Sequence, residues 1–359
     1  MPIKMQTASH AQAQSRRPED TNMAERPDRL DRPRPDAGAT KADGTRIVNA
    51  ENFARAESDT YLLRIAAQGA FGQFVHRREP LRAEQQVVIR GNPDVLMSQA
   101  VFDLEAGPVI FTLPDSGQRL MSIQVINQDH FTRSQVYAPN VHTVTRESVG
   151  TRYIAVAVRT LVNGQDASDI AQAHVLQDAL QVEQCATGHL ELPAWDQTSL
   201  KATRDALLVL AAGLPNTRHM FGTKGEVDPI RHLIGSAYAW AGQAEQHAYY
   251  LNITPELNDG TTKHRMTIKD VPVDGYWSVT VYNALGYYER NAQNLYSINS
   301  VTAKKGDNGL IEIQFGGCDG VTPNCIPISA GWNYLVRLYQ ARPEVLDGRW
   351  TFPQAIPVP

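Results

Sequence analysis

The chain contains 359 residues, of which 42% are hydrophobic and 20% are charged, and its formal net charge is -4. This composition excludes collagen-like, fibrous and wholly disordered proteins, and the slightly acidic balance excludes a strongly basic nucleic-acid-binding protein. The length exceeds what one small hydrophobic core usually spans, so we expect two or three domains.

Residues 1–46 are predicted to be a disordered leader. They contain five prolines, nine Lys or Arg and seven Asp or Glu, and few large apolar side chains to offset the entropy lost on ordering. The leader lacks the apolar core of a secretory signal, and no stretch of the chain approaches the ~18 apolar residues of a membrane helix. We therefore expect no membrane span and a cytoplasmic protein. A periplasmic or secreted location is the alternative if the start is misassigned or a signal was removed.

The cysteines are Cys185, Cys318 and Cys325, too few for a disulfide framework. Cys318 and Cys325 either close one small loop as a disulfide or remain two thiols, and the redox state of the compartment decides between these outcomes. The sequence has no CxxC pair, so we expect no metal site. We also expect no cofactor.

Between residues 85 and 160 the apolar residues recur with a period of two, which indicates β-strands. Met121, Ile123 and Val125 fall on one face of a strand, and Ser122 and Gln124 fall on the other. Short strands with frequent turns and no alternating helices favour an antiparallel sandwich. We expect strands at 85–90, 108–113, 119–126 and 153–158, a turn at 114–117, and a helix within 49–75.

From residue 166 to residue 242 the apolar period becomes helical. Ile170, Ala173 and Leu176 share one face, and similar stripes follow at 200–214 and 230–241. Asp228 followed by Pro229 is the pattern of an N-cap and a first-turn proline. The sequence therefore predicts three helices, packed as a layer between two strand-rich regions.

After residue 246 the strand pattern returns. Tyr334, Val336 and Leu338 line one face of a predicted strand, whereas Arg337 and Tyr339 line the other. Many strands without helices are typical of a jelly roll. We expect these strands at 264–269, 276–282, 310–315 and 332–339, with a tight turn at 307–309.

The common catalytic and nucleotide-binding motifs are missing from the sequence. His130 and His142 flank a loop and are candidate metal ligands, although a solvated or core histidine is the simpler interpretation. Aromatic and amide side chains alternate along the C-terminal strands. They suit a sugar or amphipathic ligand, or alternatively an aromatic core whose tyrosine hydroxyls are satisfied locally.

Several C-terminal segments resemble a known family, the domain of unknown function 1214. Upstream segments resemble its usual companion, the domain of unknown function 1254. The first set comprises 276–283 (YWSVTVYN), 294–298 (NLYSI), 336–339 (VRLY) and 345–350 (VLDGRW), and the second 91–98 (GNPDVLMS), 107–115 and 119–124. The resemblance spans roughly residues 50–359 and implies an immunoglobulin-like sandwich, a helical segment and a jelly roll. It implies no particular reaction.

The fold class expected from both lines of reasoning is mainly β with a helical segment. It comprises an immunoglobulin-like β-sandwich, a three-helix insertion and a C-terminal jelly-roll β-sandwich. The expected boundaries are a leader at 1–46, the first sandwich at 47–164, the helical segment at 165–245 and the jelly roll at 246–359.

Some positions depart from the family pattern: Met97 stands in place of a tyrosine, Asn127 of an aspartate and Cys325 of a tryptophan. These changes imply a different ligand or a lost activity. Arg119 and Arg337 have the fork geometry that holds a carboxylate or phosphate, or that pairs with a neighbouring Asp. The candidate ligand-binding residues are Asn92, Asp94, Arg119, Trp277, Tyr282, Asn294, Tyr296, Arg337 and Tyr339.

Three functions are compatible with these residues. The first is a bacterial-type protein that binds a small organic ligand (a carbohydrate, a lipid or another amphipathic molecule) at the junction of two β-sandwiches. The second is a hydrolase or lyase that uses Asp94 or His130 as a base and Arg119 to orient an anion. The third is a structural protein that forms homo-oligomers. No nucleic-acid partner is expected.

Overall fold

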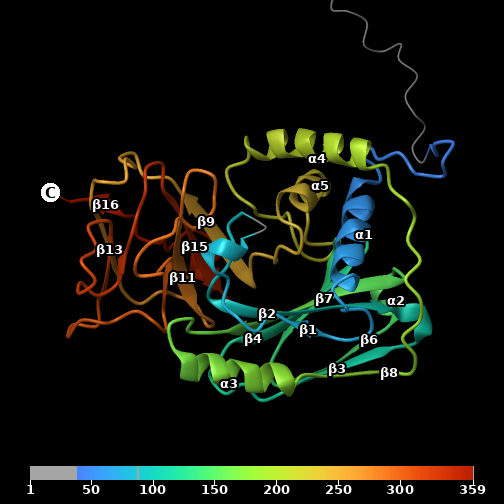
Figure 1. The fold of residues 1–359 in the computed structure, drawn as a ribbon, viewed down its shortest axis with the longest axis horizontal. Helices are drawn as coiled ribbons and strands as arrows, with labels where there is room; N and C mark the ends of the chain where they lie inside the picture. Colours follow the sequence, from blue (N-terminus) through green and yellow to red (C-terminus); the bar gives the residue numbers. More distant parts are fainter. Residues whose placement is uncertain (1–38, 87–88, 359) are drawn as a thin grey trace, which may run out of the picture. The chain divides into compact units, whose positions relative to one another are not determined.

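The structure is a computed structural model that describes residues 39–86 and 89–358. Within these residues the chain is mainly β, with its strands in four sheets (Figure 1). Most of the expected leader lies outside the described residues. Its last part does not follow the expectation of disorder, because the Arg46 N–H donates to the Ala194 carbonyl at 2.8 Å and Lys41 pairs with Asp196.

The N-terminal half is built on a five-stranded sheet in the order β1-β2-β7-β4-β5 and a three-stranded sheet in the order β6-β3-β8. Side chains of both sheets, including Phe102, Phe111, Ile123 and Val156, form one buried core. The strands are β1 Val75–His76, β2 Val95–Asp103, β3 Val109–Leu113, β4 Met121–Asn127, β5 Thr132–Tyr137, β6 Asn140–Val144, β7 Tyr153–Leu161 and β8 Gln181–Gln184.

The expected strands at 108–113, 119–126 and 153–158 are confirmed as β3, β4 and β7, and β7 is buried along its whole length at the centre of its sheet. The strand expected at 85–90 is wrong for its described residues, because Gln85 ends the 3-10 segment Ala83–Gln85 and residues 89–90 form a turn. Arg90 has a φ of 54°, which an extended strand does not contain. The strand in this region is β2, whose start follows Asp94.

Three helices, α1 Phe53–Ala66, α4 Gln197–Ala211 and α5 Pro229–Tyr238, pack together on the side of the five-stranded sheet opposite α3 (Figure 1). Their shared core includes Phe53, Leu207 and Ile234. The expected start of α5 is confirmed, because Asp228 Oδ1 accepts the backbone N–H groups of Ile230 and Arg231.

The layer of three consecutive helices expected at 165–245 is interrupted. The first of them, α3 Ala167–Asp178, packs against β7 and contributes Leu176 to the core of the sandwich. Strand β8 follows it and pairs with β3. With Val182 as its one apolar residue, β8 is a short polar edge strand, so its sequence shows no period-two pattern.

The C-terminal half contains two four-stranded sheets, in the orders β14-β13-β10-β16 and β12-β11-β15-β9. They enclose a common core that includes Trp332, Tyr334, Val336 and Phe315. The strands are β9 Ala248–Ile253, β10 His264–Ile268, β11 Trp277–Tyr282, β12 Ser297–Asn299, β13 Ile311–Phe315, β14 Cys325–Ile326, β15 Asn333–Tyr339 and β16 Ile356–Pro357. Two further helices are short, α2 Arg146–Val149 and α6 Pro343–Leu346.

The four strands expected after residue 246 are confirmed as β10, β11, β13 and β15, and so are the two faces of β15. Strands β13 and β14 are parallel, which an antiparallel reading of the sequence does not anticipate. The immunoglobulin-like and jelly-roll topologies stay predictions.

Cys318 and Cys325 form a disulfide. Among the described helices, none has the length and apolar character required to cross a membrane.

Candidate functional site

A buried polar seam joins the two halves of the described chain. We define the seam as residues 90–94 together with the polar side chains of β11, β12 and β15 that face them. Strand alternation sends Val279 and Val336 into the C-terminal core and leaves Thr280 and Arg337 on the opposite face of the same sheet. Arg337 and Asp94 are only 3% and 5% exposed, although both carry ionisable side chains.

A directional chain of hydrogen bonds connects these two residues. Arg337 Nη1 donates to Thr280 Oγ1 at 2.9 Å, the hydroxyls of Thr280 and Ser297 are 3.0 Å apart, and the Ser297 hydroxyl donates to Asp94 Oδ2 at 2.8 Å. A guanidinium only donates and a carboxylate only accepts, so each hydroxyl must pass its proton toward Asp94. The two charges are therefore linked through two hydroxyl dipoles.

Apart from the Ser278 hydroxyl, which has no described hydrogen-bond partner, the remaining groups of the seam are also paired. Arg337 Nη2 donates to Tyr282 Oη at 2.7 Å and to the Arg90 carbonyl at 2.8 Å. The Tyr282 and Tyr288 hydroxyls both donate to the Gly91 carbonyl at 2.6 Å. On the other side, Asn299 Nδ2 donates to Asp94 Oδ1 at 2.9 Å, and Asn92 Nδ2 donates to Tyr339 Oη at 2.8 Å.

Burial raises the pKa values of the acidic groups Asp94 and Tyr339 in the seam. It raises the pKa of Asp94, against the hydrogen bonds from Asn299 and Ser297 and the charge of Arg337. Burial likewise raises the pKa of Tyr339 to about 12, so its phenol stays protonated at neutral pH. The small cavity beside Asp94, about 110 Å³, is below the size of a typical ligand pocket. The seam is thus a buried and largely paired network suited to holding the two halves together.

The structure brings five of the predicted residues into this seam: Asn92, Asp94, Tyr282, Arg337 and Tyr339. Tyr296 lies at its margin, where its ring stacks on Tyr288 at 4.8 Å and its hydroxyl donates to Asn294 Oδ1. Sequence reasoning missed Thr280, Ser297, Asn299 and Tyr288. The alternation of Ser278, Thr280 and Tyr282 with buried valines is the signal that marks this polar face.

The other candidates lie elsewhere. Trp277 belongs to the C-terminal core, where its ring meets the edge of Phe352 at 6.1 Å between centroids. Arg119 forms a bidentate pair with Asp169 at 2.8 and 2.5 Å and also donates to the Leu161 carbonyl. Arg119 therefore anchors the first turn of α3.

His130 is enclosed, being 2% exposed, with Trp240 and His232 against its ring. Its Nε2 accepts the Ala241 N–H at 2.9 Å, which leaves the proton on Nδ1, where no described group accepts it. Burial and the neighbouring His232 lower the pKa of His130 to about 3. None of the described contacts joins Asp94, Arg119 and His130, and neither cavity is lined by more than one of them.

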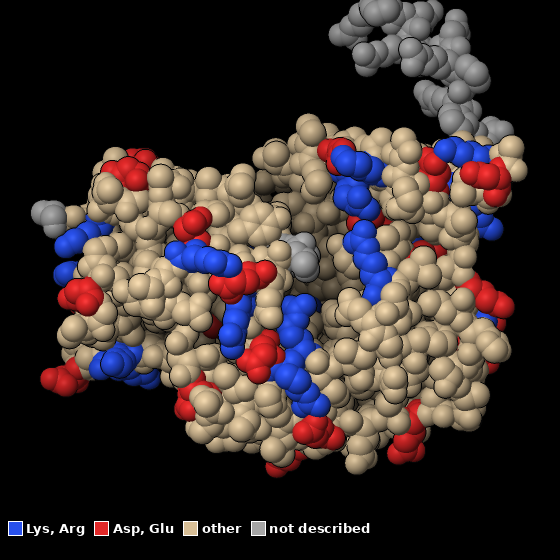
Figure 2. Space-filling model, viewed as in Figure 1, with Lys and Arg blue, Asp and Glu red and all other residues tan. Residues whose placement is uncertain are grey.

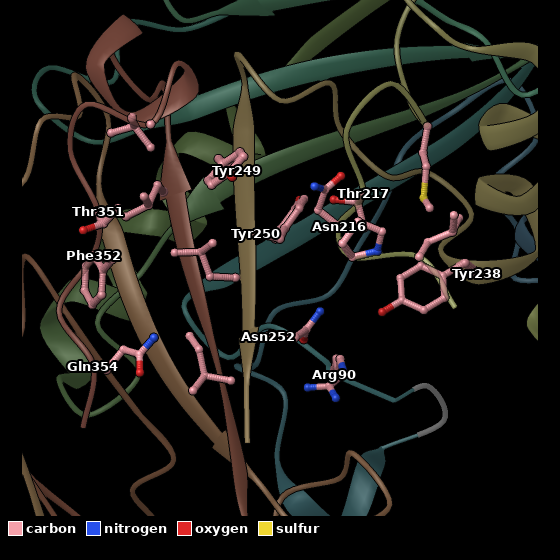
Figure 3. Close-up of a pocket in the computed structure, with 18 of the residues that line it drawn as sticks. Arg90, Asn216, Thr217, Tyr238, Tyr249, Tyr250, Asn252, Thr351, Phe352 and Gln354 are labelled. Carbon is pink, nitrogen blue, oxygen red and sulfur yellow. The ribbon is translucent and has the colours of Figure 1, made fainter. Parts of the chain in front are cut away.

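A larger cavity of about 540 Å³ opens beside β9. We call it the cleft. Its walls are the segment that follows α4, strand β9 and the segment 345–354, and the surface of this part of the molecule is visibly hollowed (Figure 2). In Figure 3, Tyr250, Asn252 and Arg90 lie on one side of β9, whereas Thr351, Phe352 and Gln354 lie on the other. The cleft therefore extends around the strand edge.

The cleft combines aromatic and amide side chains with a single charge. Among the described residues that line it, Arg90 is the only ionisable group apart from tyrosines, and none is Asp, Glu, His, Lys or Cys. Arg90 Nη1 donates to Asn333 Oδ1 at 2.9 Å, and its guanidinium lies 5.7 Å from the ring centre of Tyr282. The aromatic and amide lining residues are Tyr238, Tyr249, Tyr250, Trp350, Phe352, Asn216, Asn252 and Gln354.

None of the predicted site residues lines the cleft. The segment 248–253 (AYYLNI) carries two tyrosines and an asparagine, but it meets the end of α4 only through the tertiary fold. The described residues also contain no cluster of three His, Cys, Asp or Glu that could hold a metal ion.

Comparisons with known proteins agree with this architecture. Two family models, each described as a protein of unknown function, match the chain: DUF1254 at residues 71–147 and DUF1214 at residues 249–343. No curated protein matches it.

Two crystal structures share the fold. The VPA0106 protein from Vibrio parahaemolyticus is 15% identical with a TM-score of 0.67, and the alignment covers 86% of this chain and 98% of that one. An uncharacterized protein from Burkholderia cenocepacia is 13% identical with a TM-score of 0.50, over 86% of this chain and 88% of that one. These likenesses concern the fold alone. The two family matches stand in the expected order, with DUF1254 in the N-terminal half of the chain and DUF1214 in the C-terminal half.

Proposed function

We propose that this protein binds a small organic ligand, with both apolar and hydrogen-bonding groups, in the cleft beside β9. The observation that carries the proposal is the chemistry of the lining, in which aromatic rings and amides surround one guanidinium without a described carboxylate. Ligand pockets combine apolar walls with a few polar groups that orient the ligand, and a volume of about 540 Å³ suits a small molecule.

The lining offers two kinds of contact. Tyr238, Tyr250 and Trp350 contribute aromatic rings to the lining, and aromatic rings pack against apolar faces of a ligand. Asn216, Asn252 and Gln354 bring amides that both donate and accept hydrogen bonds. Amphipathic organic molecules match this combination. The carbohydrate, lipid or other amphipathic ligand expected from the sequence belongs to this class.

Binding fits the cleft better than catalysis does. A general acid or base must reach the reacting group, yet the described lining supplies neither a carboxylate nor an imidazole. Asp94 and His130, the bases considered for a hydrolase or lyase, are both buried away from this lining. The oligomeric alternative stays a prediction.

The disulfide bears on where binding takes place. Disulfides persist in oxidising compartments, so the Cys318–Cys325 bridge supports the periplasmic or secreted alternative over the cytoplasmic one. We propose that the ligand is met outside the cytoplasm.

Native mass spectrometry of protein purified without reductant tests the proposal. Ala212 is an exposed cleft residue just after α4, so Ala212→Trp fills the cleft without opening a cavity in the core. Ala206→Trp is the matched control, because Ala206 is exposed on α4 but does not line the cleft.

We expect the wild type and Ala206→Trp to carry extra mass that leaves on denaturation, and Ala212→Trp to lack it. Equal retention by all three proteins, or retention by none, contradicts the proposal.

A further inference from the structure

Strand β9 lies at the edge of its sheet. The hydrogen bonds of β15 show which backbone groups of β9 point toward β15 and which point away from it. The Tyr339 N–H donates to the Tyr276 carbonyl at 2.8 Å, and the Tyr339 carbonyl accepts from the Gly275 N–H. Tyr339 thus points its backbone groups toward β11. Because backbone groups alternate sides along a strand, every second residue of β15 points toward β9 instead. The pairs facing one another across β15 and β9 are Leu338 with Tyr249, Val336 with Leu251, and Tyr334 with Ile253.

The intervening residues of β9 therefore direct their backbone groups away from β15. Tyr250 and Asn252 each present an N–H and a carbonyl at the free edge, and no described group forms a backbone hydrogen bond with either. The N–H of Ala248 also points away from β15, as this alternation requires, because it donates to the Ala244 carbonyl. The edge thus offers two donors and two acceptors at the two-residue repeat of a strand, about 6.8 Å.

This free edge lies inside the cleft. Tyr250 and Asn252 both line it, and the lining residues lie on both sides of β9 (Figure 3). We call the part of the cleft on each side of the strand a chamber. One chamber contains Thr351 and Phe352, and the other contains Tyr250, Tyr238 and Arg90. A strand laid beside β9 would send alternate side chains into these two chambers, because successive side chains point to opposite faces.

We propose that the ligand of this cleft is an extended peptide segment that binds as an added strand along β9. This inference rests on the proposed function and names the class of its ligand. Backbone hydrogen bonds at Tyr250 and Asn252 supply affinity that does not depend on the peptide sequence, and the two chambers select the alternating side chains. Arg90, the one cation of the described lining, favours an acidic side chain or a C-terminal carboxylate in the chamber it shares with Tyr238.

A peptide fits the edge better than a sugar or lipid does. The repeat of donor and acceptor along an edge strand is complementary to the same repeat in another extended backbone. A sugar or lipid carries no such repeat and would leave part of the edge unpaired.

Selection from a phage-displayed library of random dodecapeptides tests this inference, with two variants at one position. Asn252→Pro removes the outward N–H, whereas the bonds to β15 come from Leu251 and Ile253, and edge strands tolerate proline where the N–H faces outward. Asn252→Ala removes the same side chain and keeps the N–H.

Enriched peptides are synthesised and their dissociation constants are measured by fluorescence anisotropy. We expect binding to the wild type and to Asn252→Ala, and at least a ten-fold weaker affinity for Asn252→Pro.

A second measurement uses only the wild type and therefore tests the inference even if Asn252→Pro does not fold. Peptides methylated at alternate backbone nitrogens are titrated against the wild type. We expect one alternating set of methyl groups to abolish binding and the other set to leave it unchanged.

Absence of any enriched peptide, equal affinity for the proline and alanine variants, or equal sensitivity to both methylated sets overturns the inference. A non-peptide molecule retained equally by the wild type and Asn252→Pro would preserve the proposed binding function while refuting a peptide ligand. A dimer of the wild type that Asn252→Pro abolishes would assign the edge to a second copy of the chain and also overturn it.

Discussion

The seam and the cleft lie along the same sheet, β12-β11-β15-β9, and both are rich in tyrosine and amide side chains. They differ in how their polar groups are paired. In the seam the Arg337 guanidinium has four hydrogen-bond partners and the Asp94 carboxylate has two. In the cleft, the outward backbone groups of Tyr250 and Asn252 have no described partner. Pairing, rather than residue type, separates a polar cluster that stabilises the fold from one available to a ligand.

The largest expected effect comes from breaking the seam at its cation. Arg337→Met removes the guanidinium, leaves the Asp94 charge buried without its counterpart, and deprives Thr280 and Tyr282 of a donor. Loss of one member of a buried ion pair typically costs about 3–5 kcal/mol, and we expect a loss of that size in the free energy of unfolding. Urea denaturation measures it.

Arg349→Met is the control, because Arg349 is an exposed residue paired with Asp347. Its unfolding midpoint should match that of the wild type. A loss below about 1 kcal/mol for Arg337→Met would show that the seam does not hold the halves together.

His130 is buried like the residues of the seam, but its Nδ1 donor has no described partner. Its pKa is lowered to about 3 in the fold, so between pH 6.5 and about 3 the unfolded chain binds one more proton than the native protein. This residue should therefore lower stability by about 1.4 kcal/mol for each pH unit of acidification below pH 6.5. The unfolding free energy measured from pH 7 to pH 4.5 gives the slope.

His130→Asn should reduce this slope by about 1.4 kcal/mol per pH unit, which is the contribution of one proton. Asparagine suits the substitution because the backbone at this position has a φ of 66°. An unchanged slope in the variant would mean that His130 takes up no proton on unfolding.

A smaller effect is expected at the acidic end of the seam. Asp94→Asn keeps the shape, and its amide would donate to Ser297 while its oxygen accepts from Asn299. Ser297 must then turn its proton away from the 2.8 Å contact with Asp94, either to the longer 3.4 Å contact with the Val279 carbonyl or to the Thr280 hydroxyl, so the hydrogen bonding of the seam is weakened. We expect a loss of about 2 kcal/mol in unfolding free energy, measured by urea denaturation. A more stable variant would contradict the directional chain of hydrogen bonds.

The smallest effect on stability is expected in the cleft. Asn252 is exposed, and its side chain makes no described hydrogen bond. Asn252→Ala should change the unfolding free energy by less than about 0.5 kcal/mol, as is usual for surface substitutions. Thermal unfolding followed by circular dichroism checks this, and a large loss would place Asn252 in the structural network instead.

The sequence predicts the seam much better than the cleft. Alternation along 276–282 and 332–339 identifies β11 and β15 and separates their core faces from the polar faces that carry Tyr282 and Arg337. The resemblance to a family then adds Asn92 and Asp94. The pairing partners Ser297 and Asn299 lie on a strand of three residues, too short for a periodic signal.

The cleft depends on contacts that no local pattern encodes. Its walls come from segments near residues 90, 215, 250 and 350, which meet only in the folded chain. Arg119 shows the opposite error. It matches the family motif, which makes it a candidate ligand-binding residue, but its guanidinium is paired with Asp169 on α3. Its partner lies fifty positions away in the sequence, so the ion pair could be anticipated only as an alternative.

Amide hydrogen exchange along β9, resolved residue by residue by NMR, tests the contrast between paired and unpaired groups most directly. We expect slow exchange for Tyr249, Leu251 and Ile253, whose amides bond to β15, and exchange at least about 100-fold faster for Tyr250 and Asn252. Equal protection of all five amides would contradict it, because the edge of β9 would then already be paired and closed to a ligand.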